Sequence, residues 1–292
     1  MWIWLSLLSA VGAAGTGLAL KRTLGGGGAV ASTVAYRAVG GAILLAAVAV
    51  AGLAGPVGAD YWGAVALVIP FEIVGTVAFT MALRAGDVSL VQPLFGLLPV
   101  TVTLGAAVAL GERPTGTAVG GIVLVAAGVY ALGRGGGRGL GAPLRALAEH
   151  PAGRWAGLSI VAWSVTTVVH KVGIEASGPM PWAVTLALGS AVALAVVGPF
   201  LPADIRVSPE EGGGGWMWWA GVAGAFYAIQ QVGLQLALAE APAGYVTAIA
   251  SVSILLAVVA GMVLLGERAA RRTRLTGGAL VTLGSALVAL FG

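Results

Sequence analysis

Glu72 lies near the middle of an apolar run that covers residues 61–83. If this run crosses a bilayer, it holds a carboxylate at membrane depth, where a charge persists only when it faces a cavity or a partner. Thr76 and Thr80 follow at four-residue spacing, so the three polar side chains share one helix face. We therefore predict a functional role for Glu72, whereas hydrogen bonds between helices explain the two threonines equally well.

A carboxylate at this depth needs a counter-ion or a proton, because desolvation opposes its ionised form. Arg37, inside the apolar run 29–54, is the candidate cation. An unpaired Glu72 would titrate and couple protons to transport, or would bind a cationic substrate. A Glu72 held by Arg37 would instead form a structural or gating ion pair. The sequence leaves both interpretations open.

A second polar stripe lies further along the chain. It consists of Tyr227, Gln231 and Gln235, each 155 positions after a member of the first stripe. Two matching stripes are what a central cavity lined by two related halves requires. Gln92, next to a helix-breaking proline, and its equivalent Thr247 add a polar pair at matching positions, which is typical of the binding region of such proteins.

Trp163 lies in the middle of another apolar run, away from the interface where tryptophan usually collects. It would either stack on a flat or cationic ligand or simply pack between helices. Thr167 and His170 share its helix face. We expect His170, beside Lys171 near the end of the run, to be an interfacial residue. Lys171 and Lys21 are expected to extend from span ends toward the headgroups.

The composition is that of a membrane protein. Of 292 residues, 59% are hydrophobic and 9% are charged, whereas a soluble domain needs about 25% charged residues to cover its surface. A helix needs about 20 apolar residues to cross a bilayer, and ten such runs are present. The runs cover about residues 2–20, 29–54, 61–83, 88–110, 115–133, 155–172, 180–201, 216–238, 243–265 and 275–291.

The two halves of the chain are related. A shift of 155 positions places Gly111-Glu112-Arg113 on Gly266-Glu267-Arg268, and a shift of 150 positions places Lys21 on Lys171. Because five spans is an odd number, the second half enters the membrane from the opposite side. We therefore predict an all-α integral membrane protein of ten transmembrane helices, built as two inverted five-helix repeats. The predicted repeats are residues 1–140 and 150–292.

These residues resemble the drug/metabolite transporter superfamily, in its ten-helix EamA-type family. The resemblance is carried by Leu110-Gly111-Glu112-Arg113 and Leu265-Gly266-Glu267-Arg268, by Trp163 followed by Lys171, and by Arg37 early in the second run. It covers nearly the whole chain. Similar proteins export amino acids, take up or expel metabolites, or move nucleotide sugars, so the resemblance implies a transporter without identifying its substrate.

Charge near the ends of the runs predicts the orientation. Twelve of the 15 basic residues lie after odd-numbered runs, so the positive-inside rule makes the odd-numbered loops cytoplasmic and both termini external. The resemblance implies cytoplasmic termini instead. Trp182 and most other tryptophans lie near run ends, as in an interface belt. Glu112 and Glu267, also at run ends, are expected only to set helix ends.

We predict a secondary transporter in the cytoplasmic membrane that exports an amino acid or amphiphilic metabolite by alternating access. Coupling to protons through Glu72 is part of this hypothesis. A lipid flippase with a basic site at Arg37 and Lys21, and a non-transporting scaffold, are the alternatives. The predicted binding residues are Glu72, Thr76, Gln92, Trp163, Thr167, Tyr227, Gln231 and Thr247.

Several chemistries are not expected. The sequence has no Walker A motif for ATP and no His-Glu-x-x-His metal motif. It has no cysteine, so thiolate metal sites and cysteine nucleophiles are excluded. We expect no enzymatic activity, no cofactor, no metal and no nucleic-acid partner. The expected partners are the solute and the bilayer, and the expected state is a monomer, with a homodimer as the alternative.

Overall fold

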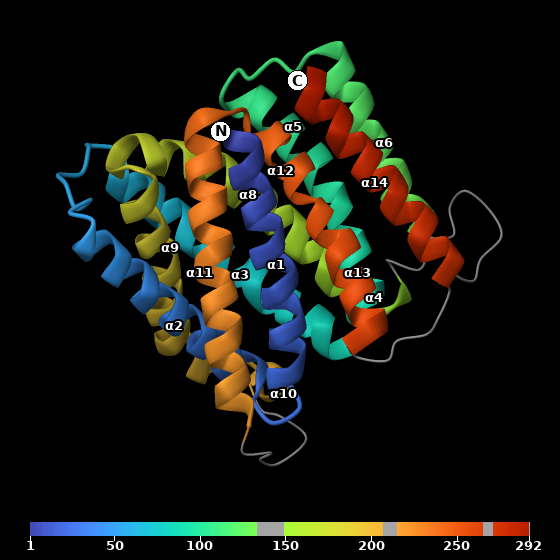
Figure 1. Ribbon diagram of the computed structural model, residues 1–292. Coiled ribbons are helices and arrows are strands. Elements are labelled where there is room, and N and C mark those ends of the chain that lie inside the picture. The colour runs from blue at the N-terminus through green and yellow to red at the C-terminus, as the bar shows by residue number, and fades with distance from the viewer. Residues whose placement is uncertain (133–148, 207–214, 265–270, 292) are drawn as a thin grey trace.

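The computed structural model describes residues 1–132, 149–206, 215–264 and 271–291. The described residues form helices and their connections, without a β-strand (Figure 1). Six stretches are long and apolar enough to cross a membrane. Five of them are α1 (Trp2–Thr23), α2 (Ala29–Val50), α3 (Tyr61–Ala85), α8 (Pro151–Ser177) and α11 (Trp216–Glu240), and the sixth is α9 (Pro179–Val197) with the 3-10 turn η2 (Gly198–Phe200).

The other predicted runs contain shorter apolar helices or helices interrupted in the middle. Each of the ten predicted runs contains helix in the described residues, and the ten-span inverted repeat itself stays a prediction. The remaining elements are α4 (Val88–Leu94), η1 (Phe95–Leu97), α5 (Leu98–Ala109), α6 (Gly116–Leu132), α10 (Ala203–Arg206), α12 (Ala243–Ala250), α13 (Val252–Leu264) and α14 (Arg271–Phe291).

Two of the runs are broken at equivalent places. The fourth run passes through η1 between α4 and α5, and the ninth run is interrupted at Ser251 between α12 and α13. A shift of 155 positions places Gly96, the central residue of η1, on Ser251. Pro99 lies in the first turn of α5, where a missing N–H group leaves no helical bond unmade.

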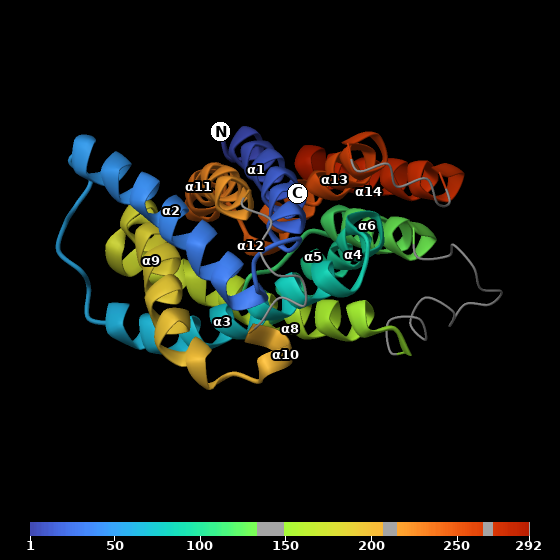
Figure 2. The ribbon, with the colours of Figure 1, turned by 90° about the horizontal axis from the view of Figure 1, so that it is seen from below.

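Five helix pairs make the closest contacts. Helix α1 packs on α11, α3 on α8, α6 on α14, and α2 on both α9 and α11 (Figures 1 and 2). Glycines allow the backbones to approach: a side chain at Gly12 would collide with the α11 backbone at Gln230, and one at Gly284 would collide with α6 at Gly121. Small residues at such contacts are typical of helices that associate in lipid.

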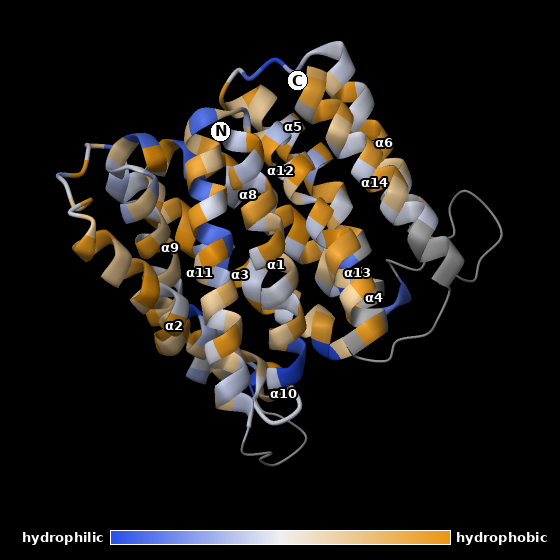
Figure 3. Ribbon diagram, viewed as in Figure 1, coloured by the Kyte–Doolittle hydropathy of each residue, from blue (hydrophilic) through white to orange (hydrophobic). Residues whose placement is uncertain are grey.

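Hydrophobic residues recur along the helices (Figure 3), and many of the exposed side chains are apolar. Exposed side chains there include Val108, Val192, Leu104 and Leu290. Many buried side chains are polar instead, among them Arg37. Because water-soluble proteins rarely expose contiguous apolar surface, this distribution fits a protein surrounded by lipid.

Candidate functional site

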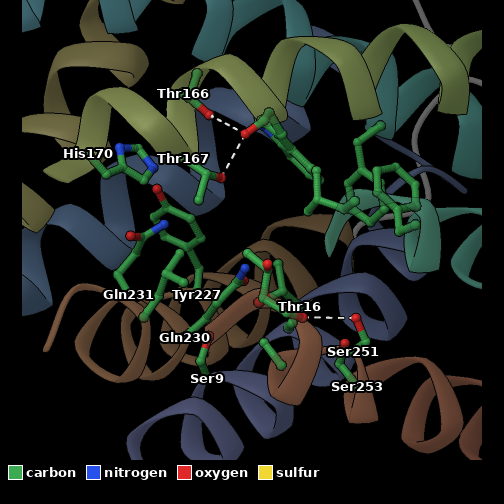
Figure 4. Close-up of a pocket in the computed structure, with 18 of the residues that line it drawn as sticks. Ser9, Thr16, Thr166, Thr167, His170, Tyr227, Gln230, Gln231, Ser251 and Ser253 are labelled. Atoms are coloured by element: carbon green, nitrogen blue, oxygen red, sulfur yellow. Dashed lines mark hydrogen bonds between the residues drawn. The ribbon is translucent and has the colours of Figure 1, made fainter. Parts of the chain in front are cut away.

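A cavity of about 150 Å³ lies between helices from both halves of the chain (Figure 4). Its walls come from α1, α2, α3, α4, η1, α5, α8, α11, α12 and α13. Seven of the eight predicted binding residues line it, namely Glu72, Gln92, Trp163, Thr167, Tyr227, Gln231 and Thr247. Thr76 is the exception: it is buried, and its hydroxyl accepts a hydrogen bond from Arg37. The role of these residues in binding a substrate stays a prediction.

A buried ion pair forms one end of the cavity. Nη2 of Arg37 lies 2.5 Å from Oε1 of Glu72, and the two residues are only 2% and 4% exposed. Arg37 also donates from Nη1 to Ser190 Oγ at 2.6 Å and from Nε to the hydroxyl of Tyr36 at 3.3 Å. A guanidinium can remain this deep because several partners compensate for its lost hydration.

Two tyrosine rings cover the guanidinium. The centroid of the Tyr227 ring is 5.0 Å from Cζ of Arg37, and that of the Tyr36 ring is 5.9 Å away. The rings meet edge to face, with centroids 5.4 Å apart. Glu72 and Tyr227 are equivalent under the shift of 155 positions, so both polar stripes contact Arg37. The guanidinium therefore joins the two halves of the chain by an ion pair on one side and a cation–π contact on the other.

Aromatic rings form a second wall of the cavity. Trp163 packs on Phe79 and Phe95, with ring centroids 5.2 and 5.5 Å apart, and the two phenylalanines meet edge to face at 5.3 Å. Gly75 leaves the space that the indole occupies, since a Cβ atom there would lie 2.5 Å from Cδ1 of Trp163. Next to this contact, the hydroxyl of Ser159 donates to the carbonyl of Gly75 at 2.7 Å.

A third wall is polar, and the sequence analysis missed most of it. Ser9 and Thr16 face the cavity from α1, and Gln230 faces it from α11 (Figure 4). Ser251, between α12 and α13, and Ser253, at the start of α13, also line it. Serine and threonine are common in membrane helices, where their hydroxyls bond to the preceding turn, as Thr16 does with the carbonyl of Gly12 at 2.8 Å. The seven-residue spacing of Ser9 and Thr16, two turns on one face, was the available signal.

The last members of the two predicted stripes, Thr80 and Gln235, do not line the cavity. The hydroxyls of Thr80 and Thr33 are 3.0 Å apart, which links α3 to α2. On α11, Nε2 of Gln235 donates to Oε1 of Gln231 at 2.9 Å. Thr80 and Gln235 are completely buried. The structure therefore divides each stripe into a part beside the cavity and a part between helices.

His170 is not an interfacial residue, so that prediction was wrong. It is 4% exposed and lines the cavity, because α8 continues to Ser177 and leaves His170 two turns inside the helix end. Trp182, in the first turn of α9, is completely buried, and its indole N–H donates to Nδ1 of His170 at 3.3 Å. Figure 4 shows His170 beside Tyr227 and Gln231.

The two lysines expected to extend toward headgroups bind protein groups instead. Nζ of Lys171 lies 2.7 Å from Oε1 of Glu112, whose other oxygen accepts the backbone N–H of Ala243 at 3.0 Å. Lys21 donates to the carbonyl oxygens of Leu83 and Gly86 at 2.5 and 2.8 Å. Glu112 therefore does more than end its own helix, because it connects the first half of the chain to α8 and to the start of α12. The second glutamate, Glu267, lies outside the described residues.

The described residues contain no group of three or more histidine, aspartate or glutamate side chains that could hold a metal ion. A family model for the EamA-like transporter family matches residues 1–134 and 153–290. The chain belongs to this family. The predicted resemblance is therefore confirmed, and membership points to a multi-pass membrane transporter of small solutes rather than an enzyme.

Among solved structures, 28 chains match this chain. One of them, titled only "Crystal structure of protein", is 21% identical in sequence with a TM-score of 0.74, over 99% of this chain and 96% of that chain. At this identity the likeness concerns the fold alone. A search of curated proteins finds no match.

Proposed function

We propose that this EamA-family protein is a secondary active transporter that exports a small organic solute by alternating access around the cavity. The observation that carries the proposal is the cavity itself: it is lined by polar and aromatic side chains from both halves of the chain, among helices that expose many apolar side chains. A polar space of this kind inside a membrane protein is typical of a solute pathway.

Equivalent positions in the two halves support an inverted repeat of ten spans, with residues 1–140 and 150–292 as its two units. Gln92 and its equivalent Thr247 both line the cavity, as do Glu72 and Tyr227. The helix breaks at η1 and at Ser251 are also equivalent. The first and third spans are α1 and α3, and their equivalents in the second half, the sixth and eighth spans, are α8 and α11. The repeat therefore makes the α1–α11 contact equivalent to the α8–α3 contact, and both pairs are closely packed. Transport would rock one unit against the other.

Of the two interpretations of Glu72, the geometry supports the ion pair. Its carboxylate is held by Arg37 at 2.5 Å, so in this conformation Glu72 is neither a free proton acceptor nor a free site for a cation. We propose that the pair stabilises one conformation of the carrier. If transport is coupled to protons, protonation of Glu72 must weaken its pair with Arg37. The variant Glu72→Gln mimics this protonated state, because the glutamine side chain is neutral.

The odd-numbered loops are proposed to be cytoplasmic, in the cytoplasmic membrane, because most basic residues follow the odd-numbered spans. We propose a monomer, since the two halves of one chain supply the residues that line the cavity. The flippase alternative gains no support: the basic groups it would need, Arg37 and Lys21, already bind protein partners. A scaffold would gain little from a polar cavity that includes a buried ion pair.

Reconstituted vesicles test the proposal. Vesicles preloaded with a panel of unlabelled amino acids and amphiphilic metabolites should accumulate the matching labelled solute by counterflow, and vesicles without protein should not. A fluorescent-lipid assay on the same vesicles tests the flippase. Lipid scrambling without solute counterflow would reject the carrier, and inactivity in both assays by folded protein would support the scaffold.

A further inference from the structure

The formal charges on the cavity wall cancel. Among the described residues that line the cavity, Arg37 and Glu72 are the ones with a formal charge, and they bind each other. The other two nitrogens of Arg37 donate to Ser190 and Tyr36, and Nη2, which binds Glu72, also donates to Thr76. Neither partner of the pair therefore presents an uncompensated charge to a solute.

His170 adds no charge in this arrangement. The indole N–H of Trp182 can only donate, so Nδ1 of His170 is the acceptor of the 3.3 Å hydrogen bond and carries no proton. The geometry therefore assigns His170 as the neutral tautomer with its proton on Nε2. The imidazole presents one neutral donor beside Tyr227 and Gln231 (Figure 4).

The groups left for a solute are neutral. Side-chain amides of Gln92, Gln230 and Gln231 and the hydroxyls of the third wall line the polar side, while Trp163 and two phenylalanines form the apolar side. The hydroxyl of Tyr227 is buried in the wall, 3% exposed, and forms no hydrogen bond of good geometry with the described residues. A buried polar group without a partner is unfavourable, and a solute that bonds to it would remove that cost.

A solute with a net charge would enter this cavity without a counter-ion. Burying an uncompensated charge is far more costly than burying a neutral polar group that finds hydrogen bonds. We infer, on the basis of the proposed carrier function, that the self-compensated Arg37–Glu72 pair makes the cavity selective for amphiphilic solutes without net charge. The apolar part of the solute packs on the aromatic wall, and its polar part bonds to the amides and to Tyr227.

Three probes of one skeleton test this selectivity: phenylacetamide, which is neutral, phenylacetate, an anion, and phenethylamine, a cation. Their affinities for the purified full chain are measured by calorimetry, with thermal shift as a second readout. Wild type should bind phenylacetamide at least tenfold more tightly than either ion. Glu72→Gln leaves Arg37 uncompensated, so phenylacetate should become the preferred ion. Arg37→Gln leaves Glu72 uncompensated, so phenethylamine should become preferred.

Two controls keep the test decisive if a single variant fails to fold. Ser190→Ala removes a hydrogen bond to Arg37 but no charge, and it should keep the wild-type order of the probes. The double variant Arg37→Gln/Glu72→Gln removes both charges and should also prefer the neutral probe. A charged probe that binds wild type as tightly as phenylacetamide would overturn the inference. Single variants that keep the wild-type order of the probes would also overturn it. So would a failure of every probe to bind to wild type and to the double variant.

The inference and the proposed function can fail separately. Selective binding of phenylacetamide, with no counterflow of any solute in vesicles, would support the inference about charge and reject the carrier. Counterflow of an anionic or cationic solute at rates above those of neutral solutes would support the carrier and overturn the inference.

Discussion

The carboxylate of Glu72 lies 2.5 Å from the guanidinium of Arg37, and both residues are almost completely buried. Removing one partner leaves the other charge buried alone, which costs about 3–5 kcal/mol, whereas removing both leaves no such charge. We expect Glu72→Leu and Arg37→Leu each to lower the melting temperature of the purified protein strongly, and the double variant to recover much of the loss.

The thermodynamic cycle formed by these variants measures the coupling between the two residues. Wild type, both single variants and the double variant are compared in the same detergent. A double variant that is as unstable as the sum of the single variants would show that the two charges do not compensate each other, and would contradict the pair described above.

Gly75 provides the space for Trp163. A Cβ atom at position 75 would lie 2.5 Å from Cδ1 of the indole, so Gly75→Ala should displace Trp163, destabilise the fold by about 1–3 kcal/mol and weaken solute binding. Gly157→Ala on α8 is the matched control, because nothing lies within 4 Å of its added methyl group. Melting temperature and probe affinity are measured for both variants. Equal behaviour of the two would contradict the assigned role of Gly75.

Tyr227 has two separable contacts with the cavity. Its ring covers Arg37, with 5.0 Å from the ring centroid to Cζ, and its hydroxyl forms no hydrogen bond of good geometry with the described residues. Tyr227→Phe keeps the ring, so we expect unchanged or slightly higher stability and a loss of solute affinity of about 1 kcal/mol, or roughly fivefold. Calorimetry with phenylacetamide checks this value. Unchanged affinity would show that the hydroxyl does not contact the solute.

Glu112 connects distant parts of the chain. It pairs with Lys171 at 2.7 Å and accepts the backbone N–H of Ala243 at the start of α12. Because Glu112 is partly exposed, we expect Glu112→Gln, which keeps an oxygen for the cap, to lower stability by less than about 1 kcal/mol, and Glu112→Ala to lower it further. Thermal unfolding checks this order. Equal losses in the two variants would show that the cap contributes nothing.

The sequence was sufficient to predict the helices but not all of the contacts between them. Long apolar runs predicted the helices well, because a bilayer-spanning helix must be apolar along its length. The end of α8 was placed too early, since the exposed Glu175 and the charge of Lys171 interrupt the apolar run although the helix continues to Ser177. That error moved His170 from the cavity to the interface.

Contacts between distant residues were harder to predict. The repeat relation placed Glu72 and Tyr227 at equivalent positions, and Arg37 was the candidate cation for Glu72. Nothing local in the sequence indicates that Glu112 meets Lys171 and Ala243, or that Trp182 donates to His170, because these contacts depend on how whole helices pack.

Alternating access to the cavity is the central claim, and the cysteine-free chain allows a direct measurement. One variant carries a single cysteine at Gln92, which lines the cavity and is 6% exposed. The control variant carries a single cysteine at Val68, which is completely buried. A membrane-impermeant maleimide is applied to intact cells and to inverted membrane vesicles. We predict that Gln92→Cys reacts from both sides, more slowly when a transported solute is present, and that Val68→Cys reacts from neither. Reaction of Gln92→Cys from one side only, with or without solute, or no reaction at all, would contradict the account.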